Sequence, residues 1–208
     1  MKTGISMFMI ILTTTAVWGD LPPLPESMAE TSAFEQVSLL CSPDGTGRSL
    51  TEAMTRWGGV VDATVTVTLR SWNYDPIPNY PAEDIWLEST SGGMSACLGG
   101  AIADGPTDVH GQTRFTVPLQ AGGHTDPVAG EKLQVVVNGS PLSASRLDIQ
   151  INSPDLDGDL DVDLTDVVIF VQSYFSGNDD YAVDFHCDGS INLSDLVVMA
   201  SHVNVTCP

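Results

Sequence analysis

A 12-residue segment in the last third of the chain carries a carboxylate at almost every second position. It runs from Asp155 to Asp166, reads DLDGDLDVDLTD, and has aspartate at positions 1, 3, 5, 7, 9 and 12. Calcium is a hard cation that takes about six to eight oxygen ligands, and a 12-residue loop supplies them from these positions, with position 7 using its backbone carbonyl. The segment therefore predicts a calcium-binding loop. The candidate ligands are Asp155, Asp157, Asp159, Asp161, Asp163 and Asp166.

A second copy of the pattern begins 29 residues later, and an apolar run of helical character follows each copy. The segment DFHCDGSINLSD, from Asp184 to Asp195, has oxygen ligands at positions 1, 5, 9 and 12 and glycine at position 6. Position 3 is His186, whose nitrogen is a poor ligand for calcium. We therefore expect a weaker second site, or a His186 that points away with water in its place. The candidate ligands are Asp184, His186, Asp188, Ser190, Asn192 and Asp195.

The residue at position 12 separates these loops from EF-hands. An EF-hand uses glutamate there and has a helix before the loop, whereas both copies here have aspartate and a strand-like segment, 149–151, precedes the first. Two loop-helix units with aspartate at position 12 and a hydrophobe at position 8, Val162 and Ile191, resemble dockerin modules over about residues 153–206. The resemblance implies two bound calcium ions and docking onto a cohesin-like domain, which assembles secreted proteins on scaffolds or cell surfaces.

Two features of the loops depart from the dockerin pattern. Position 6 of the first loop is Leu160, where the turn favours glycine, and a left-handed backbone there costs about 1 kcal/mol. Positions 10 and 11, often Ser-Thr in dockerins, are Leu-Thr and Leu-Ser, and the basic residues that usually follow on the helices are absent. We therefore expect Leu164 and Leu193, at position 10, to be exposed docking contacts.

The apolar residues after each loop predict a pair of packed helices. We expect these side chains to meet each other as a small core rather than to form a groove for a partner. A module of this size also needs metals or disulfides, because its core alone is marginal. The residues are Val167, Val168, Phe170, Val171 and Tyr174 in the first helix and Leu196, Val197, Met199 and Ala200 in the second.

The acidic composition excludes several classes of protein. The 208 residues include 27 Asp and Glu against 7 Lys and Arg, which gives a net charge of −20. Binding to nucleic acid or to an anionic membrane surface needs clustered cations, which this chain lacks. A disordered acidic tail is poor in apolar residues, whereas 42% of this chain is apolar. Twelve acidic residues and no Lys or Arg lie between Asp148 and Pro208, so the charge is concentrated around the predicted loops.

The N-terminal sequence predicts export. Lys2 is followed by an apolar run from Ile5 to about Trp18 and then by Gly19 and Asp20, which is the pattern of a cleaved signal peptide over residues 1–19. The run is shorter than the roughly 20 residues that a membrane span needs. We therefore expect a secreted or surface-associated product with no membrane insertion after cleavage. Residues 20–32 are Pro-rich and polar, which predicts an extended leader.

Export makes disulfides possible for the four cysteines. They allow three pairings, and no C-x-x-C motif or Cys/His cluster indicates a metal site instead. The division of the chain into two domains favours Cys41 with Cys97 and Cys187 with Cys207. The second bond would hold the C-terminal tail against the second loop.

Residues 33–152 predict an antiparallel β-sandwich, because short alternating or β-branched runs are divided by turns and no helical period occurs. Segments 63–70 and 107–117 are similar to strand and turn patterns of bacterial Ig-like surface domains. The predicted fold is mainly β with a small α module: an Ig-like sandwich followed by a two-repeat loop-helix calcium domain at 153–208. The expected strands are 34–40, 60–69, 84–87, 113–118, 133–137 and 147–151.

The sequence contains no recognisable catalytic constellation. The histidines lie in turns, loops or the tail, the segment 93–97 is not a nucleophile elbow, and a sandwich of about 120 residues leaves little room for a glycosidase cleft. We therefore expect a secreted, non-catalytic bacterial protein that uses the module for assembly through protein–protein interaction. One alternative is a carbohydrate-binding sandwich, with Trp72 and Tyr74 as stacking residues. The other is a structural subunit that assembles with copies of itself.

Overall fold

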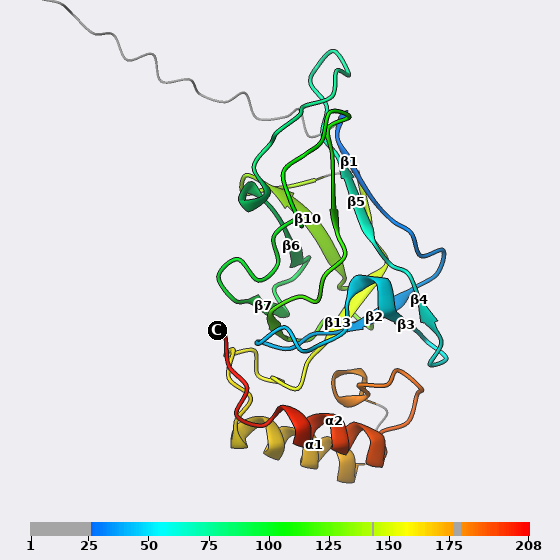
Figure 1. Cartoon of the computed structure of the whole chain (residues 1–208). Helices are drawn as coiled ribbons and strands as arrows, with labels where there is room; N and C mark the ends of the chain where they lie inside the picture. The colour runs from blue at the N-terminus through cyan, green and yellow to red at the C-terminus, as the bar shows by residue number, and fades with distance from the viewer. Residues whose placement is uncertain (1–25, 143, 177–179) are drawn as a thin grey trace, which may run out of the picture.

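The computed structural model describes residues 26–142, 144–176 and 180–208. A β-rich region and a pair of helices lie end to end, with the helices below the strands in Figure 1. The chain is mainly β with a small helical region. The expected signal peptide, residues 1–19, lies outside the described residues. None of the helices within the described ranges has the length and apolar character that crossing a membrane requires.

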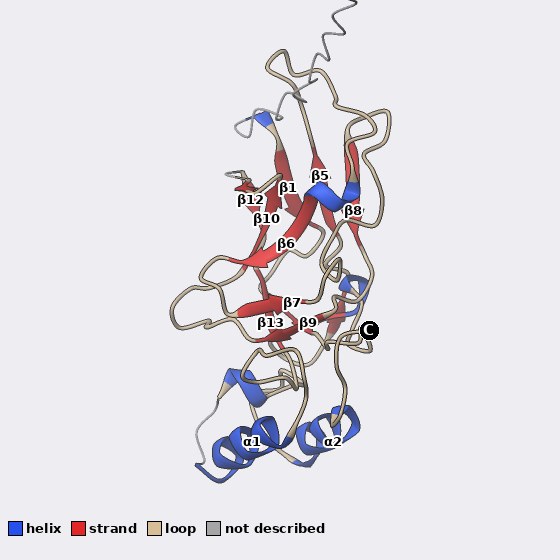
Figure 2. Cartoon of the chain, turned by 90° about the vertical axis from the view of Figure 1, so that its left-hand side faces the viewer, coloured by secondary structure: helices blue, strands red, loops and turns tan. Residues whose placement is uncertain are grey.

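The strands of the described residues form four small sheets (Figure 2). Two four-stranded sheets have the orders β12-β1-β5-β8 and β13-β2-β3-β4, a three-stranded sheet has the order β11-β10-β6, and β7 pairs with β9. The strands are β1 (Met28–Thr31), β2 (Val37–Leu40), β3 (Ala53–Thr55), β4 (Val60–Val61), β5 (Val65–Thr68), β6 (Ile85–Ser89), β7 (Met94–Ala96), β8 (Gln112–Phe115), β9 (Ala121–Gly123), β10 (Leu133–Val137), β11 (Ser140–Pro141), β12 (Ser145–Arg146) and β13 (Ile149–Asn152).

Each of the six expected strands overlaps an observed one, but the run 60–69 is divided between β4 and β5. The division occurs because the Asp62 carboxylate accepts hydrogen bonds from the N–H and the hydroxyl of Thr64, at 2.8 and 2.6 Å. Such local bonds compete with the strand ladder. The prediction of an antiparallel arrangement was wrong for two pairings, because β12 lies parallel to β1 and β13 lies parallel to β2. Both pairings join segments far apart in the sequence, which local patterns do not report.

The expected leader was too long. Strand β1 lies inside 20–32 and pairs antiparallel with β5, and its Ala29 is fully buried. Residues 27–32 contain no proline, so each of their backbone N–H groups can join a sheet. The Ser27 hydroxyl also accepts the N–H of Arg70 at 3.0 Å. The β-rich region therefore begins before residue 33.

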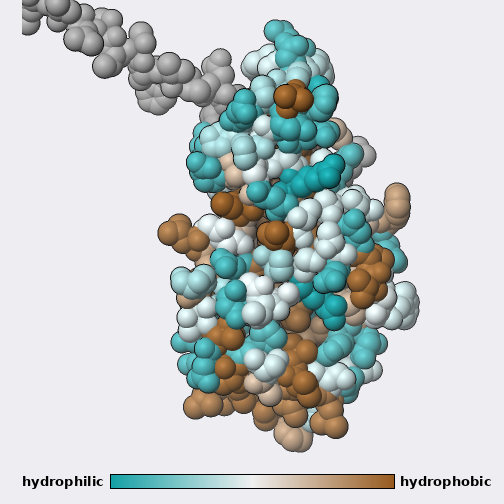
Figure 3. All heavy atoms as spheres, viewed as in Figure 1, coloured by the Kyte–Doolittle hydropathy of each residue, from teal (hydrophilic) through white to brown (hydrophobic). Residues whose placement is uncertain are grey.

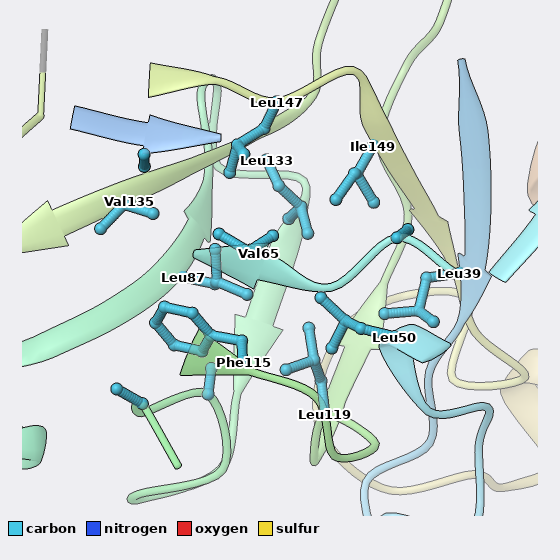
Figure 4. Close-up of a cluster of buried hydrophobic side chains, with 14 of the residues drawn as sticks. Leu39, Leu50, Val65, Leu87, Phe115, Leu119, Leu133, Val135, Leu147 and Ile149 are labelled. Carbon is cyan, nitrogen blue, oxygen red and sulfur yellow. The ribbon is translucent and has the colours of Figure 1, made fainter. Parts of the chain in front are cut away.

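One apolar core fills the β-rich region (Figure 4). Strand β6 alternates buried and half-buried residues, as expected for a strand with one face on the core. Burying a large apolar side chain contributes about 1.5–3 kcal/mol, so this core supplies most of the stability of the β-rich region. Side chains that are 1% exposed or less include Leu39, Val65, Leu87, Phe115, Leu133 and Ile149.

A second, smaller core lies under the helices α1 (Leu164–Ser176) and α2 (Leu193–His202). Phe170 of α1 stacks on Phe185, with ring centroids 5.9 Å apart. Leu40 of β2 also belongs to this core, whereas its neighbour Leu39 belongs to the first. Successive strand side chains point to opposite faces, so β2 is shared by both cores. The short 3-10 helices are η2 (Leu50–Glu52), η3 (Ala82–Asp84) and η4 (Tyr181–Val183).

The prediction that the helix residues meet as a core was only partly right. Val167 and Tyr174 are half-buried and pack against the second core. Of the nine residues expected there, only Phe170 and Met199 are buried, while Val168 and Val197 are 54% and 67% exposed. The reason is that side chains outside the helices, such as Phe185, fill the space between the helices and the β-rich region. Each helix therefore turns a second apolar face outward.

The cysteine pairing also differs from the expected one. Cys97, after β7, is bonded to Cys207 in the C-terminal tail, with the two Cα atoms 5.8 Å apart. Cys41 and Cys187 are free and buried. The tail after α2 returns to the β-rich region, and the chain ends close to β7 in Figure 1. The predicted pairs assumed that each domain closes its own disulfide, whereas the observed bond joins the helical region to the β-rich one.

Candidate metal centre

Asp155, position 1 of the first loop, is fully buried where the loop meets the β-rich region. Its carboxylate accepts hydrogen bonds from the N–H of Gly158 at 2.9 Å and of Leu160 at 2.8 Å. Its carbonyl accepts the N–H of Gly123, in β9, at 2.7 Å. Position 1 is therefore fixed both to its own loop and to the sheet.

Asp166, position 12, closes the loop from the other side. It lies in the first turn of α1 and is fully buried. Its Oδ1 accepts the N–H of Leu156 at 2.7 Å and of Asp157 at 3.3 Å, and its Oδ2 accepts the N–H of Asp163 at 2.8 Å. One carboxylate thus ties the beginning of the loop to its end, and its negative charge lies favourably at the helix N-terminus.

Asp155, Asp157 and Asp159 each place one carboxylate oxygen within 4.8 Å of the others. Two oxygens bound to one calcium ion at about 2.4 Å each lie at most about 4.8 Å apart. The spacing therefore suits a single ion, and a donor set made only of carboxylate oxygens suits a hard cation. Among the residues that the structure describes, this is the one group of three acidic, histidine or cysteine side chains so close together.

The second loop repeats the hydrogen bonds of the first. Asp184, at position 1, accepts the N–H of Gly189 at 2.8 Å. Asp195, at position 12, accepts the N–H of His186 at 3.2 Å and of Asn192 at 2.9 Å. These two carboxylates are 8% and 0% exposed, as deeply placed as their counterparts in the first loop.

The two loops differ at position 3, where the second loop has His186. Its ring Nδ1 lies 3.3 Å from Oδ1 of Asp195, so the ring points toward position 12 rather than away. Among the described residues, Asp184, His186 and Asp188 do not form a cluster like the one in the first loop. The expectation of a weaker second site stays a prediction.

The side chains at position 9 cap the helices instead of joining a cluster. Asp163 accepts the N–H of Thr165 at 2.5 Å, and Asn192 accepts the N–H of Ser194 at 2.8 Å. Both are therefore N-terminal caps, of α1 and α2 respectively. At position 7 both side chains are exposed, those of Asp161 and Ser190, which leaves the backbone carbonyl as the donor there.

Position 6 is left-handed in both loops. Leu160 has a φ of 73° and Gly189 a φ of 80°. The expected strain at Leu160 is therefore present, at about 1 kcal/mol relative to glycine. The N–H of each of these residues donates to the carboxylate at position 1, which holds the turn in place.

Negative charge accumulates in both loops without a compensating cation. Burial raises the pKa of Asp155 to about 6, and the nearby charges of Asp166 and Asp159 add to the rise, although the N–H groups of Leu160 and Gly158 oppose it. Burial likewise raises the pKa of Asp184, and Asp195 contributes. Among the described residues, the one Lys, Arg or His nitrogen within 4 Å of a carboxylate is Nδ1 of His186, 3.3 Å from Asp195, and this contact is an ion pair only when the ring is protonated. A divalent cation would relieve this repulsion.

The C-terminal tail braces the first loop. Val162, at position 8, donates its N–H to the carbonyl of Val205 at 2.8 Å and accepts the N–H of Asn204 at 2.8 Å. Just beyond Val205, the disulfide between Cys207 and Cys97 anchors this tail to the β-rich region. The prediction that the tail lies against the second loop was therefore wrong.

The glycines of β9 are site residues that the sequence did not indicate, because Ala121–Gly123 looks like a turn. A Cβ atom at Gly122 would lie 1.7 Å from Oδ2 of Asp155, so only glycine leaves room for that carboxylate. We expect Gly122→Ala to displace Asp155 and to weaken calcium binding at the first loop at least about tenfold, measured by calorimetry. The matched control is Gly105→Ala, where nothing lies within 4 Å of the added Cβ. Equal affinities for the two variants would contradict this coupling.

Comparisons with protein family models, with curated proteins and with solved structures found no match. What this chain does is therefore inferred from its own residues.

Proposed function

We propose that this chain is an exported, non-catalytic protein in which a dockerin-like module binds two calcium ions and docks onto a protein partner outside the cell. The observation that carries the calcium assignment is the acidic triad Asp155, Asp157 and Asp159, whose oxygens have the mutual spacing of ligands on one ion. The matching hydrogen bonds of the second loop support a second ion there. The sandwich, which we propose to be Ig-like, presents the module.

The outward faces of the two helices support docking. Leu164 and Leu193, both at position 10, are 75% and 68% exposed, and Val168 and Val197 occupy the next equivalent positions. Apolar residues gather over the lower end of the molecule, where α1 and α2 lie (Figure 3). Exposed apolar surface of this kind is typical of protein interaction sites. We call it the helical face, formed by Leu164, Val168, Val171, Phe175, Leu193, Leu196 and Val197.

A cohesin-like domain is the partner that the resemblance in sequence implies, and another surface protein or a second copy of the chain would meet the same face. Self-association is opposed by the net charge of −20, since like-charged copies repel. Size-exclusion chromatography with and without calcium separates these partners: a calcium-dependent dimer would favour a second copy, and a monomer a different protein.

Calcium titration of the full chain is the experiment that tests this function. At about pH 7.5 we expect calorimetry to report two binding events and a rise in the unfolding temperature, because ligand that binds only the folded state stabilises it. An EDTA-treated sample is the reference. Absence of binding at micromolar calcium, with no thermal shift over EDTA, would overturn the proposal.

Lowering the pH of the same titration to about 5 is expected to change both the calcium-free stability and the calcium affinity, each in a defined direction. The folded-state pKa of Asp155, about 6, lies above the ordinary value of 3.8, so the calcium-free fold binds this proton more tightly than the unfolded chain does. Calcium-free stability therefore rises as the pH falls through about 6, while calcium affinity falls by roughly tenfold because the ion must displace the proton. An affinity that increases on acidification would contradict the role of Asp155.

A further inference from the structure

A cavity of about 540 Å³ lies where the sheet β13-β2-β3-β4 faces the second loop, and none of the residues of the helical face line it. Its walls come from both regions of the molecule: Gln150 and Ser38 on the sheet, Trp57 on the turn between β3 and β4, and Asp188 and Ser190 on the loop. Its volume is in the range of sites that hold small ligands, which is about 300–1,000 Å³. Another cavity, beside the first loop, has a volume of about 360 Å³.

Gln150 is the residue that points to a ligand. It is only 5% exposed, it lines the cavity, and its carboxamide has no hydrogen-bond partner among the described residues. Ser38, its register partner on β2, is by contrast satisfied by the Tyr181 hydroxyl. The buried side-chain nitrogen and oxygen atoms that lack a partner among the described residues belong to Arg48, His124 and Asn152, so the unpartnered amide of Gln150 is open to the cavity rather than sealed from it. The amide of Gln150 is therefore available to something that enters the cavity.

Trp57 adds a flat apolar surface at the mouth of the same cavity. The turn is built to present it: the Thr55 hydroxyl accepts the N–H of Gly59 at 3.0 Å, and Gly58 is left-handed with a φ of 77°. The indole is 83% exposed, and neither its N–H nor the guanidinium of Arg56 has a partner within the ranges that the structure describes. Single exposed apolar side chains are common on protein surfaces, but this indole lines a cavity of ligand size, where a flat apolar group can stack on it.

These groups specify the chemistry of the ligand. A carboxamide offers both a donor and an acceptor, so its natural partners are groups that do the same, such as hydroxyls. The carboxylates of Asp184 and Asp188 and the guanidinium of Arg56 line the cavity together, so its charges select neither a strongly anionic nor a strongly cationic ligand. A ligand with many hydroxyls, no net charge and one flat face of C–H groups satisfies Gln150 and covers Trp57 together.

We propose that this cavity binds a neutral carbohydrate, with Trp57 stacking on a sugar ring and the Gln150 carboxamide hydrogen-bonded to its hydroxyls. The proposal goes beyond calcium-dependent docking, and it places the sugar on a different surface from the partner of the helical face. It also differs from the assignment of sugar stacking to Trp72 and Tyr74, which are exposed but line neither described cavity.

The test is calorimetry on the calcium-saturated full chain with cellotetraose, xylotetraose, mannotetraose and N-acetylchitotetraose as probes. We expect at least one of them to bind, and we expect Trp57→Ala and Gln150→Leu each to weaken that binding at least about tenfold. Trp72→Ala is the matched control, because Trp72 is 78% exposed, close to the value for Trp57. Trp57 is so exposed that its removal leaves the fold intact.

Three results would overturn the proposal: no binding of any of the four sugars up to millimolar concentration, full binding by Trp57→Ala, or loss of binding in Trp72→Ala. Calcium titration of the same samples reports separately on the proposed function. A chain that binds calcium but no sugar, or sugar but no calcium, therefore distinguishes the failure of one proposal from the failure of the other.

Discussion

Replacing Asp155 and Asp166 together by alanine is expected to abolish calcium binding at the first loop and most of the stabilisation that calcium gives. The two carboxylates hold the loop through five backbone N–H groups, and Asp155 is also a member of the acidic triad. Calcium at about a thousand times its dissociation constant stabilises a one-site protein by about 4 kcal/mol. We expect the variant to lose a calcium-dependent stabilisation of that size. Calorimetry should then show one binding event fewer, and calcium should raise the unfolding temperature by less.

A control double variant that removes the same number of negative charges shows whether the effect comes from losing calcium ligands or only from the change in charge. Asp75→Ala with Asp148→Ala also removes two carboxylates, but both side chains are exposed and neither makes a hydrogen bond within the described residues. This control is expected to keep two binding events. If Asp155→Ala with Asp166→Ala still titrates with two calcium ions, the first loop is not the site.

The second large effect is expected from removing the disulfide. Cys97 and Cys207 are 110 residues apart in the sequence, and in the chain-entropy view closing a loop of about 100 residues stabilises a protein by about 4–5 kcal/mol. We expect Cys97→Ser with Cys207→Ser to lower the free energy of unfolding by several kcal/mol in denaturant titrations. Release of the tail also removes the brace on Val162, so calcium affinity at the first loop should fall too.

Cys187→Ala is the matched control for this variant, because it distinguishes the observed bond from the pairing of Cys187 with Cys207. Cys187 is a buried free thiol, and burial raises its pKa to about 11, so it is unreactive as well as unpaired. Its replacement should cost much less than loss of the disulfide. A non-reducing peptide map that joins Cys187 to Cys207 would contradict the observed connection.

The two acidic loops were the most predictable region of the molecule because their information is local. Ligand spacing over 12 residues predicted that Asp155, Asp157 and Asp159 would gather, and it predicted the left-handed turn at Leu160. The strands were nearly as accessible, since alternation such as that of Ile85–Ser89 reports a half-buried strand wherever it lies in the fold.

What the sequence did not predict depends on contacts between distant segments. The pairing of Cys97 with Cys207 requires the tail to pass the first loop, and no pattern near either cysteine reports that path. Gly122 looked like a turn residue, because the carboxylate that needs its missing Cβ lies more than thirty positions later in the sequence. The outward face of the helices was misjudged for a similar reason, since Phe185 and Leu40 fill the core that Val168 and Val197 were expected to fill.

The disulfide also decides how the molecule carries mechanical load. The helical region is attached to the β-rich region at two points, by the peptide that follows β13 at its start and by the sulfur bridge near its end. A pull on the helical face is therefore shared between two covalent paths, so the acidic loops and the disulfide bear the force together. Attachment at both ends means that the helices cannot separate from the sheet by breaking noncovalent contacts at one end alone. A protein that anchors an assembly under shear would hold its partner at a fixed distance and orientation for as long as both paths remain intact.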